Sequence, residues 1–140
     1  MDRFTKEKRS YIMSRVSGKN TKPEETVRKY LFSEGFRYRR NDGRYPGKPD
    51  IVLPKYHTMI FVNGCFWHQH PGCRSATLPE ANREYWESKL KRNVDRDKMQ
   101  ISLLEEMGWR VIILWECEIS NKKKRQDRLS ALVCEIKNGL

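Results

Sequence analysis

A short loop rich in potential metal ligands, NGCFWHQHPGC at positions 63–73, constrains the fold of this chain more than any other feature. Two cysteines and a histidine follow the spacing C-x4-H-x2-C, and Cys117 lies just beyond the apolar segment WRVIILW (109–115). Four nitrogen and sulfur ligands make the closed tetrahedral site of a structural zinc ion. The predicted ligands are Cys65, His70, Cys73 and Cys117. Such a site would fasten the loop to the end of a distant strand.

Length and charge narrow the class of protein. A chain of 140 residues can form one domain that buries about two-thirds of its unfolded surface. Lys plus Arg number 29 against 18 Asp plus Glu, and the net charge of +11 favours a polyanionic partner, nucleic acid before an anionic membrane. No apolar run suits a signal peptide or a membrane span. We therefore predict one cytoplasmic, nucleic-acid-binding domain without a membrane partner over residues 1–140, in which residues 1–20 form a basic helical arm.

The cysteines and histidines allow other interpretations. In a reducing compartment the cysteines can be free thiols beside surface histidines, because disulfides are rare there. The histidine ligand can also be His68 in place of His70. Cys134 shares a predicted helical face with Val133 and Ile136, and free cysteine is often buried, so we predict that Cys134 belongs to the core.

Hydrophobic periodicity predicts alternating helices and strands. A helix begins at Thr21, where Thr followed three residues later by Glu24 is a capping box, and it ends near Gly35. FRYRR (36–40) alternates like an edge strand. The other predicted elements are strands over 50–53 and 58–62, helices over 80–92 and 94–107, a fully buried strand over 109–115 and an amphipathic helix over 121–138. Helices flanking a mixed central sheet make an α/β or α+β domain.

The two apolar strands at 50–53 and 58–62 read as an antiparallel hairpin. With its loop centred on Tyr56, Asp50 faces Val62 across the hairpin. A carboxylate beside a strand-exit carbonyl offers two hard oxygen ligands, and Mg²⁺ takes one or two such carboxylates together with waters and substrate phosphate. The alternative is an aspartate that only caps a turn. The hairpin thus predicts a candidate magnesium site.

Two further residues are candidates for acid–base chemistry. If zinc binds His70, His68 stays free on a loop of fixed shape, and imidazole is a common general base. Asp97 lies on the apolar stripe of the helix predicted over 94–107, where an unpaired carboxylate is costly, so His68 is a candidate partner. Alternatively, His68 is an ordinary surface residue and Asp97 pairs with Arg96 or Lys98 in solvent.

Several uncommon strings occur in the order in which they occur in one known family. These strings are NTKPE, GKPDIVL, IFVNGCFWHQHPGC, YWESKLKRNVDRD and GWRVIILWEC. Over roughly residues 5–120 the chain resembles the very-short-patch repair (Vsr) DNA mismatch endonucleases. The resemblance implies a fold similar to type II restriction endonucleases, with a mixed sheet between helices. It also implies an enzyme that nicks one DNA strand 5′ to the T of a T:G mismatch, the product of 5-methylcytosine deamination, and so starts very short patch repair.

The resemblance implies roles for individual residues. Asp50 and the backbone carbonyl of Val62 would bind catalytic Mg²⁺. His68 would act as the general base, oriented by Asp97, and Glu24 would lie near the waters of the metal. The four cysteine and histidine ligands above correspond to the structural zinc site of the family.

Aromatic residues of the same loop, with a Trp from the segment that follows it, correspond to a wedge that enters the base stack beside the mismatch. The matching residues are Phe66, Trp67 and Trp86. Unstacking a base step costs a few kcal/mol, which stacking on the side chains offsets, and a mismatched pair opens more cheaply. The implied partners are double-stranded DNA with a T:G mismatch and repair-coupling proteins, and a monomer is expected because a nick needs one active site.

Two alternatives to this function remain. The first is a restriction-like nuclease that cuts matched duplex. The second is a zinc-stapled DNA-binding module without catalysis, since IFVNG lacks the acid and lysine that restriction-type nucleases usually place on the second strand.

Overall fold

The computed structural model describes residues 21–138, and the basic helical arm predicted over residues 1–20 lies outside them. The described chain forms the helices α2 Lys22–Ser33, α3 Arg83–Glu106 and α4 Lys122–Asn138, and the strands β1 Arg39–Arg40, β2 Ile51–Leu53, β3 Thr58–Asn63 and β4 Arg110–Trp115. Three short 3₁₀ helices span Pro54–Tyr56, Arg74–Ala76 and Glu116–Ile119. None of the described helices is both long and apolar enough to cross a membrane.

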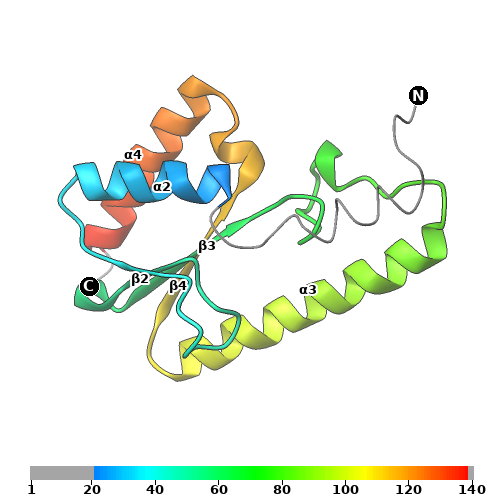
Figure 1. Ribbon diagram of the computed structural model, residues 1–140, viewed down its shortest axis with the longest axis horizontal. Helices are drawn as coiled ribbons and strands as arrows, with labels where there is room; N and C mark the ends of the chain where they lie inside the picture. The colour runs from blue at the N-terminus through cyan, green and yellow to red at the C-terminus, as the bar shows by residue number, and fades with distance from the viewer. Residues whose placement is uncertain (1–20, 139–140) are drawn as a thin grey trace.

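The strands form one mixed sheet in the order β1-β2-β3-β4. β1 pairs with β2 and β2 with β3 in antiparallel fashion, whereas β3 and β4 are parallel. A parallel pair needs a crossover connection, which α3 supplies. α2 and α4 lie over one face of the sheet, and α3 runs along the other (Figure 1). The predicted α+β architecture, a mixed sheet flanked by helices, is confirmed.

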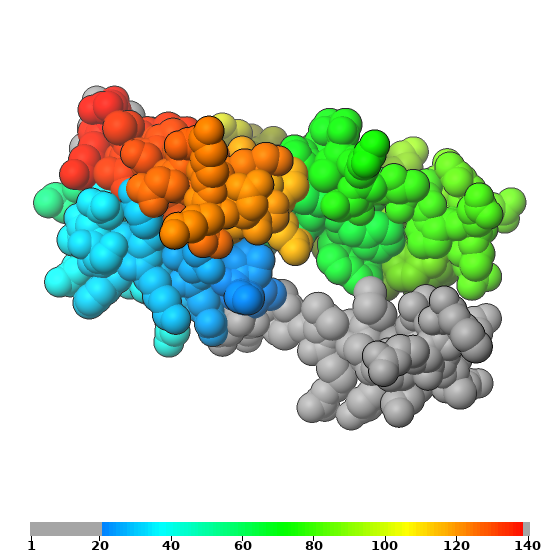
Figure 2. Space-filling view, turned by 90° about the horizontal axis from the view of Figure 1, so that it is seen from above, coloured from blue at the N-terminus to red at the C-terminus, as the bar shows by residue number. Residues whose placement is uncertain are grey.

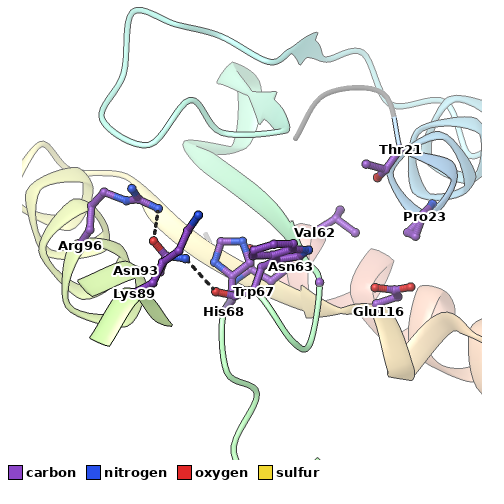
Figure 3. Close-up of a pocket in the computed structure, with 11 residues that line it drawn as sticks. Thr21, Pro23, Val62, Asn63, Trp67, His68, Lys89, Asn93, Arg96 and Glu116 are labelled. Carbon is purple, nitrogen blue, oxygen red and sulfur yellow. Dashed lines mark hydrogen bonds between the residues drawn. The ribbon is translucent and has the colours of Figure 1, made fainter. Parts of the chain in front are cut away.

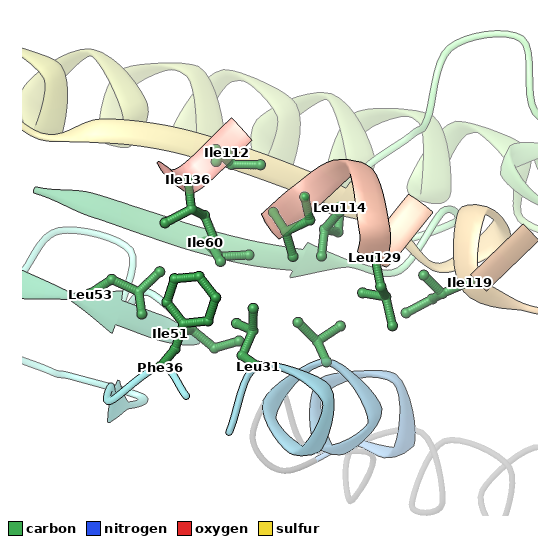
Figure 4. Close-up of a cluster of buried hydrophobic side chains, with 12 residues drawn as sticks. Leu31, Phe36, Ile51, Leu53, Ile60, Ile112, Leu114, Ile119, Leu129 and Ile136 are labelled. Atoms are coloured by element: carbon green, nitrogen blue, oxygen red, sulfur yellow. The ribbon is translucent and has the colours of Figure 1, made fainter. Parts of the chain in front are cut away.

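The core lies mainly between the sheet and the pair α2 and α4. Leu31 of α2 and Leu129 of α4 surround Ile60 of β3 in this cluster (Figure 4). Successive side chains of a strand point to opposite faces, so Met59 packs on the other side of the sheet against Leu104 of α3. The sheet is therefore held from both faces, and the end of β3 is a fixed point from which a site can be built.

α2 begins and ends where the sequence predicts. The Thr21 side chain accepts a hydrogen bond from the backbone N–H of Glu24 at 3.4 Å, and Pro23 lies in the first turn. After the helix, Gly35 adopts a φ of +92°, a left-handed conformation that glycine reaches without strain. The predicted edge strand is also present but is reduced to Arg39–Arg40, which pairs only with β2.

The β2–β3 hairpin is confirmed, but its predicted register is wrong by one residue. Ile51 pairs with Ile60, so continuation of the ladder puts Phe61, and not Val62, opposite Asp50. The connection is a 3₁₀ turn that closes through His57 in the left-handed region at φ +49°. His57 is the last residue of this turn, so the loop is centred closer to the N-terminus than the predicted centre, Tyr56.

Two predicted helices, over 80–92 and 94–107, are one continuous helix, α3. Nothing between Arg83 and Glu106 interrupts it, since the segment contains neither proline nor glycine. Asn93, at the predicted boundary, uses its side-chain amide for a hydrogen bond to the carbonyl of Trp67 at 3.4 Å. Asn93 thus ties the middle of α3 to the ligand-rich loop.

β4 is not fully buried, contrary to the prediction. Ile112 and Leu114 are buried, whereas the residues that alternate with them are half-buried. α3 buries only Leu90 and Leu104, so it covers that face of the sheet incompletely.

Cys134 is exposed, so its prediction as a core residue is wrong. The buried stripe of α4 consists of Leu129, Leu132 and Ile136, which recur at helical spacing. Cys134 is adjacent in sequence to residues near that stripe, but the helical turn of about 100° per residue carries its side chain to the outer side.

Candidate active site and metal centre

A pocket of about 690 Å³ opens where β3 ends. Figure 3 shows His68 and Trp67 in its centre, Arg96 of α3 on one side and Thr21 and Pro23 at the start of α2 on the other. Three separate elements therefore meet at this point: the N-terminus of α2, the loop after β3 and the middle of α3. The residues predicted for catalysis lie in or beside this pocket.

Asp50 lies against the end of β3 despite the shifted register. The backbone N–H of Val62 donates a 2.6 Å hydrogen bond to the Asp50 carboxylate, and Val62 lines the pocket. Burial raises the pKa of the Asp50 carboxyl to about 8, and the charge of the nearby Glu24 carboxylate adds to the rise, while the bond from Val62 lowers it. Glu24 is itself buried and accepts a hydrogen bond from Arg28 at 3.3 Å.

Two carboxylates held together in a nearly buried position favour a cation between or beside them. Asp50 is 8 % exposed and Glu24 is 2 % exposed. Hard oxygen ligands of this kind suit Mg²⁺, whose charge would offset the burial and the Glu24 repulsion that raise the Asp50 pKa. The arrangement fits a magnesium site at the edge of the pocket.

His68 and Asp97, which are distant in sequence, are in direct contact. The Asp97 carboxylate lies 2.5 Å from Nδ1 of His68, and both side chains are partly buried. A carboxylate on Nδ1 fixes the ring orientation and the tautomer, which leaves Nε2 as the nitrogen that can accept a proton. The alternative pairing of Asp97 with Arg96 is not formed, because Arg96 instead donates to the side chain of Asn93 at 3.2 Å.

The predicted zinc ligands gather in one cluster, in which the ligand atoms lie within 4.8 Å of one another. Nδ1 of His70 is 3.8 Å from the Cys65 sulfur and 3.4 Å from the Cys117 sulfur. Zn–N and Zn–S bonds of about 2.0–2.3 Å imply ligand separations of roughly 3.3–3.8 Å in a tetrahedron, so these distances fit zinc. The histidine in this cluster is His70, and His68 contacts Asp97 instead.

The surroundings of the cluster fix its shape. The His70 ring stacks on Trp115, the last residue of β4, with centroids 4.2 Å apart. A hydrogen bond from the backbone N–H of Ser75 lowers the pKa of Cys73 to about 7, whereas burial raises the pKa of Cys65 to about 12. Zinc binding would hold both sulfurs as thiolates, and it would pin the loop to the end of the sheet.

Three aromatic side chains form a trio beside the pocket. Phe66, Trp67 and Trp86 meet edge to face, with centroid separations of 5.2, 5.6 and 5.9 Å. Their segment, coloured green in Figure 2, lies at one end of the molecule, beyond α2 and α4. The rings are only half-buried, because they pack mainly on one another and on α3.

Sequence reasoning missed two residues around this trio. Tyr85 packs on Trp86 at 5.3 Å and is 54 % exposed. The Lys89 ammonium lies 5.9 Å from the ring centroids of Tyr85, Trp86 and Trp67. Their separation by four residues on one helix was the available signal, since such residues share a face.

Comparison with known proteins agrees with this geometry. The model of the family described as DNA mismatch endonuclease Vsr matches residues 1–74. The type II nicking enzyme V.NmeAIP of Neisseria meningitidis serogroup A is 49 % identical over 139 residues, which cover 99 % of each chain. The nicking enzyme V.XorIIP of Xanthomonas oryzae pv. oryzae is 44 % identical, with 99 % of this chain and 96 % of the relative covered.

A relative that is named for mismatch repair also aligns over most of its length. The DNA mismatch endonuclease Vsr of Escherichia coli K12 is 37 % identical, and the match covers 95 % of this chain and 88 % of that protein. The family model and these relatives lead to one assignment. The chain belongs to the Vsr family of DNA mismatch endonucleases and is an endodeoxyribonuclease of DNA repair.

Proposed function

We propose that this endonuclease nicks one DNA strand 5′ to the T of a T:G mismatch left by 5-methylcytosine deamination, in a reaction that depends on Mg²⁺. The observation that carries the proposal is the contact between His68 and Asp97 at a pocket that is also lined by Trp67 of the aromatic trio and by Val62, the hydrogen-bond partner of Asp50. A general base, a cation site and a base-stacking surface thus lie within one chain. The enzyme would act as a single-domain monomer in the cytoplasm, with repair-coupling proteins as further partners.

His68 would act directly on the attacking water. Its Nε2 would take a proton from the water as the new P–O bond forms, and the bond to the leaving 3′ oxygen breaks. Asp97 would keep the ring in the correct tautomer and stabilise the imidazolium that results. Glu24, which lies beside Asp50, would orient water near the metal.

Asp50 and the backbone carbonyl of Val62 would hold the Mg²⁺ ion. When bound, the ion would neutralise charge on the scissile phosphate and on the leaving oxygen. The N–H bond from Val62 fixes the Asp50 carboxylate beside the end of β3, which supports this assignment. Cys65, His70, Cys73 and Cys117 would hold a structural zinc ion.

The aromatic trio would provide recognition of the mismatch. Phe66, Trp67 and Trp86 form a rigid apolar surface, and stacking of a base on an aromatic ring contributes about 1–3 kcal/mol. A mismatched step costs less to open than a paired one, so the same wedge favours T:G over T:A.

A nicking assay on end-labelled duplexes tests this function. Duplexes with T:G or T:A in a cytosine-methyltransferase site would be incubated with Mg²⁺ or with EDTA. We expect a single nick 5′ to the mismatched T, only with Mg²⁺ and only in the T:G duplex. Equal cleavage of the T:A duplex would establish instead a restriction-like nuclease for matched DNA. Family membership leaves the non-catalytic module without support.

Replacing His68 with alanine should slow the nicking step about 10²–10⁴-fold, because a positioned base contributes a factor of that size. Asp97→Asn should reduce the rate by a factor in the same range, since the ring loses its fixed tautomer. Single-turnover rates at saturating enzyme would measure both effects, and added imidazole should partly restore His68→Ala. The control is His57→Asn, which changes an exposed histidine whose left-handed backbone suits asparagine. Full loss of activity in this control would contradict the assignment of His68 as the general base.

Asp50 should make the metal-free protein less stable as the pH rises. Its folded-state pKa of about 8 lies above the value near 3.9 of an unfolded chain, so the folded state binds the proton more tightly and loses stability between about pH 4 and 8. In Asp50→Asn this side chain stays neutral at every pH. We expect the free energy of unfolding of this variant to exceed that of the wild type by about 1–3 kcal/mol at pH 8 and by less at pH 5. Chemical denaturation in EDTA would measure the difference.

The control for this experiment is Asp42→Asn. The Arg44 side chain, which donates to Asp42, lowers the pKa of that carboxyl to about 2. The ion pair therefore stabilises the fold above about pH 4 and is lost as the pH falls through the folded-state pKa. Asp42→Asn should weaken the protein by the same amount at pH 5 and pH 8, so a pH-independent effect of Asp50→Asn would refute the burial of its charge.

A further inference from the structure

A second pocket, of about 320 Å³, adjoins the first and shares His68, Asn63 and Arg96 with it. The rest of its lining comes from the loop before β2, from Phe61 of β3 and from the face of α3 that carries Asp97. None of the residues proposed to bind Mg²⁺ or to wedge into DNA lines this second pocket. The metal and wedge roles therefore do not account for this pocket, which the proposed base His68 and its partner Asp97 border on one side.

The loop before β2 is fixed against α3 at this pocket. A Cβ atom on Gly47 would lie 2.9 Å from Oε1 of Gln100, and the φ of Gly47 is +79°. The left-handed φ favours glycine here, and the loop backbone lies against the Gln100 side chain of α3 and the Phe61 ring of β3. Gln100 lies one helical turn beyond Arg96 on the same face. The contact consequently brings Lys48, the next residue of the loop, to the pocket that Arg96 lines.

Lys48 has an unfavourable backbone conformation for its residue type. Its φ is +48°, a left-handed value that glycine or asparagine adopts more readily than lysine. The backbone N–H of Lys48 holds the turn by donating to the carbonyl of Tyr45 at 3.1 Å. The backbone would be satisfied equally well with glycine at this position. Because this strained lysine also borders a pocket, its side chain is a candidate for a functional role.

The charges around the second pocket favour an anion. Lys48 and Arg96 are cationic, and the carboxylate among the lining residues, Asp97, contacts His68. Within residues 21–138, neither Lys48 nor Arg96 forms an ion pair, and Arg96 donates only to the neutral amide oxygen of Asn93. Lysine presents a compact charge and arginine a planar pair of donors, which together suit a phosphate group.

We propose that Lys48 and Arg96 form a second phosphate subsite, which binds a backbone phosphate next to the scissile one in the nicked strand. The inference rests on the proposed function, because it requires a DNA strand to pass His68. A strand that is held both at the scissile phosphate and at the phosphate next to it is fixed in position and direction. Lys48 is thus a positioning residue, and it acts on the reaction through the substrate.

Lys48→Gly tests the subsite because it removes the charge and relieves the backbone strain together. The equilibrium binding of a T:G duplex in EDTA would be measured over a range of salt concentrations. We expect affinity to fall about five- to tenfold near 0.15 M salt and the slope of log K against log [salt] to shrink by about 0.9, the contribution of one phosphate. The melting temperature should stay the same or rise. An unchanged slope would overturn the proposal.

A matched control separates this effect from a general loss of charge. Lys55 is exposed in the 3₁₀ turn at the start of β3, the opposite end of that strand from Val62. Lys55→Ala should leave the salt slope and the affinity near those of the wild type. A reduction as large as that of Lys48→Gly would show only a net-charge effect and would overturn the subsite.

Uncharged methylphosphonates, placed singly along the nicked strand, would locate the contacted phosphate. The subsite predicts one position, beside the scissile phosphate, at which the methylphosphonate lowers the affinity of the wild type but does not further lower the affinity of Lys48→Gly. Equal losses in both proteins at every position would reject the subsite. The wild-type nicking assay is read separately: if the T:G duplex is not nicked but the binding pattern holds, the proposed reaction fails and the phosphate subsite stands.

Discussion

Asp50→Asn is expected to lower Mg²⁺-dependent nicking of a T:G duplex by about 10³-fold or more. The carboxylate lies in the buried position at the end of β3, next to Glu24, where it would be the main anionic ligand of the metal. Transition-state stabilisation by a bound cation amounts to several kcal/mol, and each 1.4 kcal/mol is about tenfold in rate. Initial rates over a Mg²⁺ titration would measure the loss, and gel-shift affinity for the same duplex should change by less than about threefold.

Two features make this result informative. The same substitution is expected to stabilise the metal-free protein at pH 8, so a loss of activity cannot be attributed to unfolding. Asp127→Asn, on the exposed surface of α4, is the matched control and should nick at the wild-type rate. Nicking by Asp50→Asn at a rate within tenfold of the wild type would remove Asp50 from the metal site.

Cys117→Ser is expected to abolish tight zinc binding and to lower the melting temperature by about 10 °C or more. Cys117 joins the loop of Cys65 to the segment that follows β4, so its loss releases the loop from the sheet. Structural zinc contributes several kcal/mol of folding free energy, and each kcal/mol corresponds to a few degrees in a domain of this size. Metal analysis of the purified protein and a thermal melt would measure both changes.

The fourth cysteine provides the control. Cys134 is exposed on α4 and lies outside the cluster, so Cys134→Ser should keep the full zinc content and the wild-type melting temperature. Because Phe66 and Trp67, the proposed wedge, follow Cys65 directly, Cys117→Ser should also nick T:G duplex more slowly. A zinc-free Cys117→Ser protein with unchanged stability would show that the cluster does not support the fold.

Much of the fold was accessible from sequence because it depends on local chemistry. Apolar periodicity located α4 and the paired strands, and the Thr21 cap located the start of α2. The spacing of cysteines and histidines selected four residues that the structure gathers within 4.8 Å. The stripe position of Asp97 singled out a carboxylate in need of a partner, and His68 is the partner that the structure provides.

Other features depended on contacts that local patterns do not encode. The register of the hairpin was missed because the 3₁₀ turn that closes at His57 leaves four residues, 54–57, between the paired Leu53 and Thr58, one fewer than the predicted loop. The unbroken α3 was missed because apolar periodicity alone does not show whether two neighbouring helical stretches continue through the residue between them, Asn93. The orientation of Cys134 follows from the exact rotation of α4 on the sheet, which sequence neighbours do not fix.

The sequence by itself determined the residue types of the site, the elements that carry them and the family. Only the tertiary structure decided that Lys48 and Arg96 border one pocket beside His68, and that Glu24 raises the pKa of Asp50. These relationships join segments that are far apart along the chain. Their distances are set by packing of the loop before β2 and of α2 around the sheet, and a local sequence pattern carries no information about such packing.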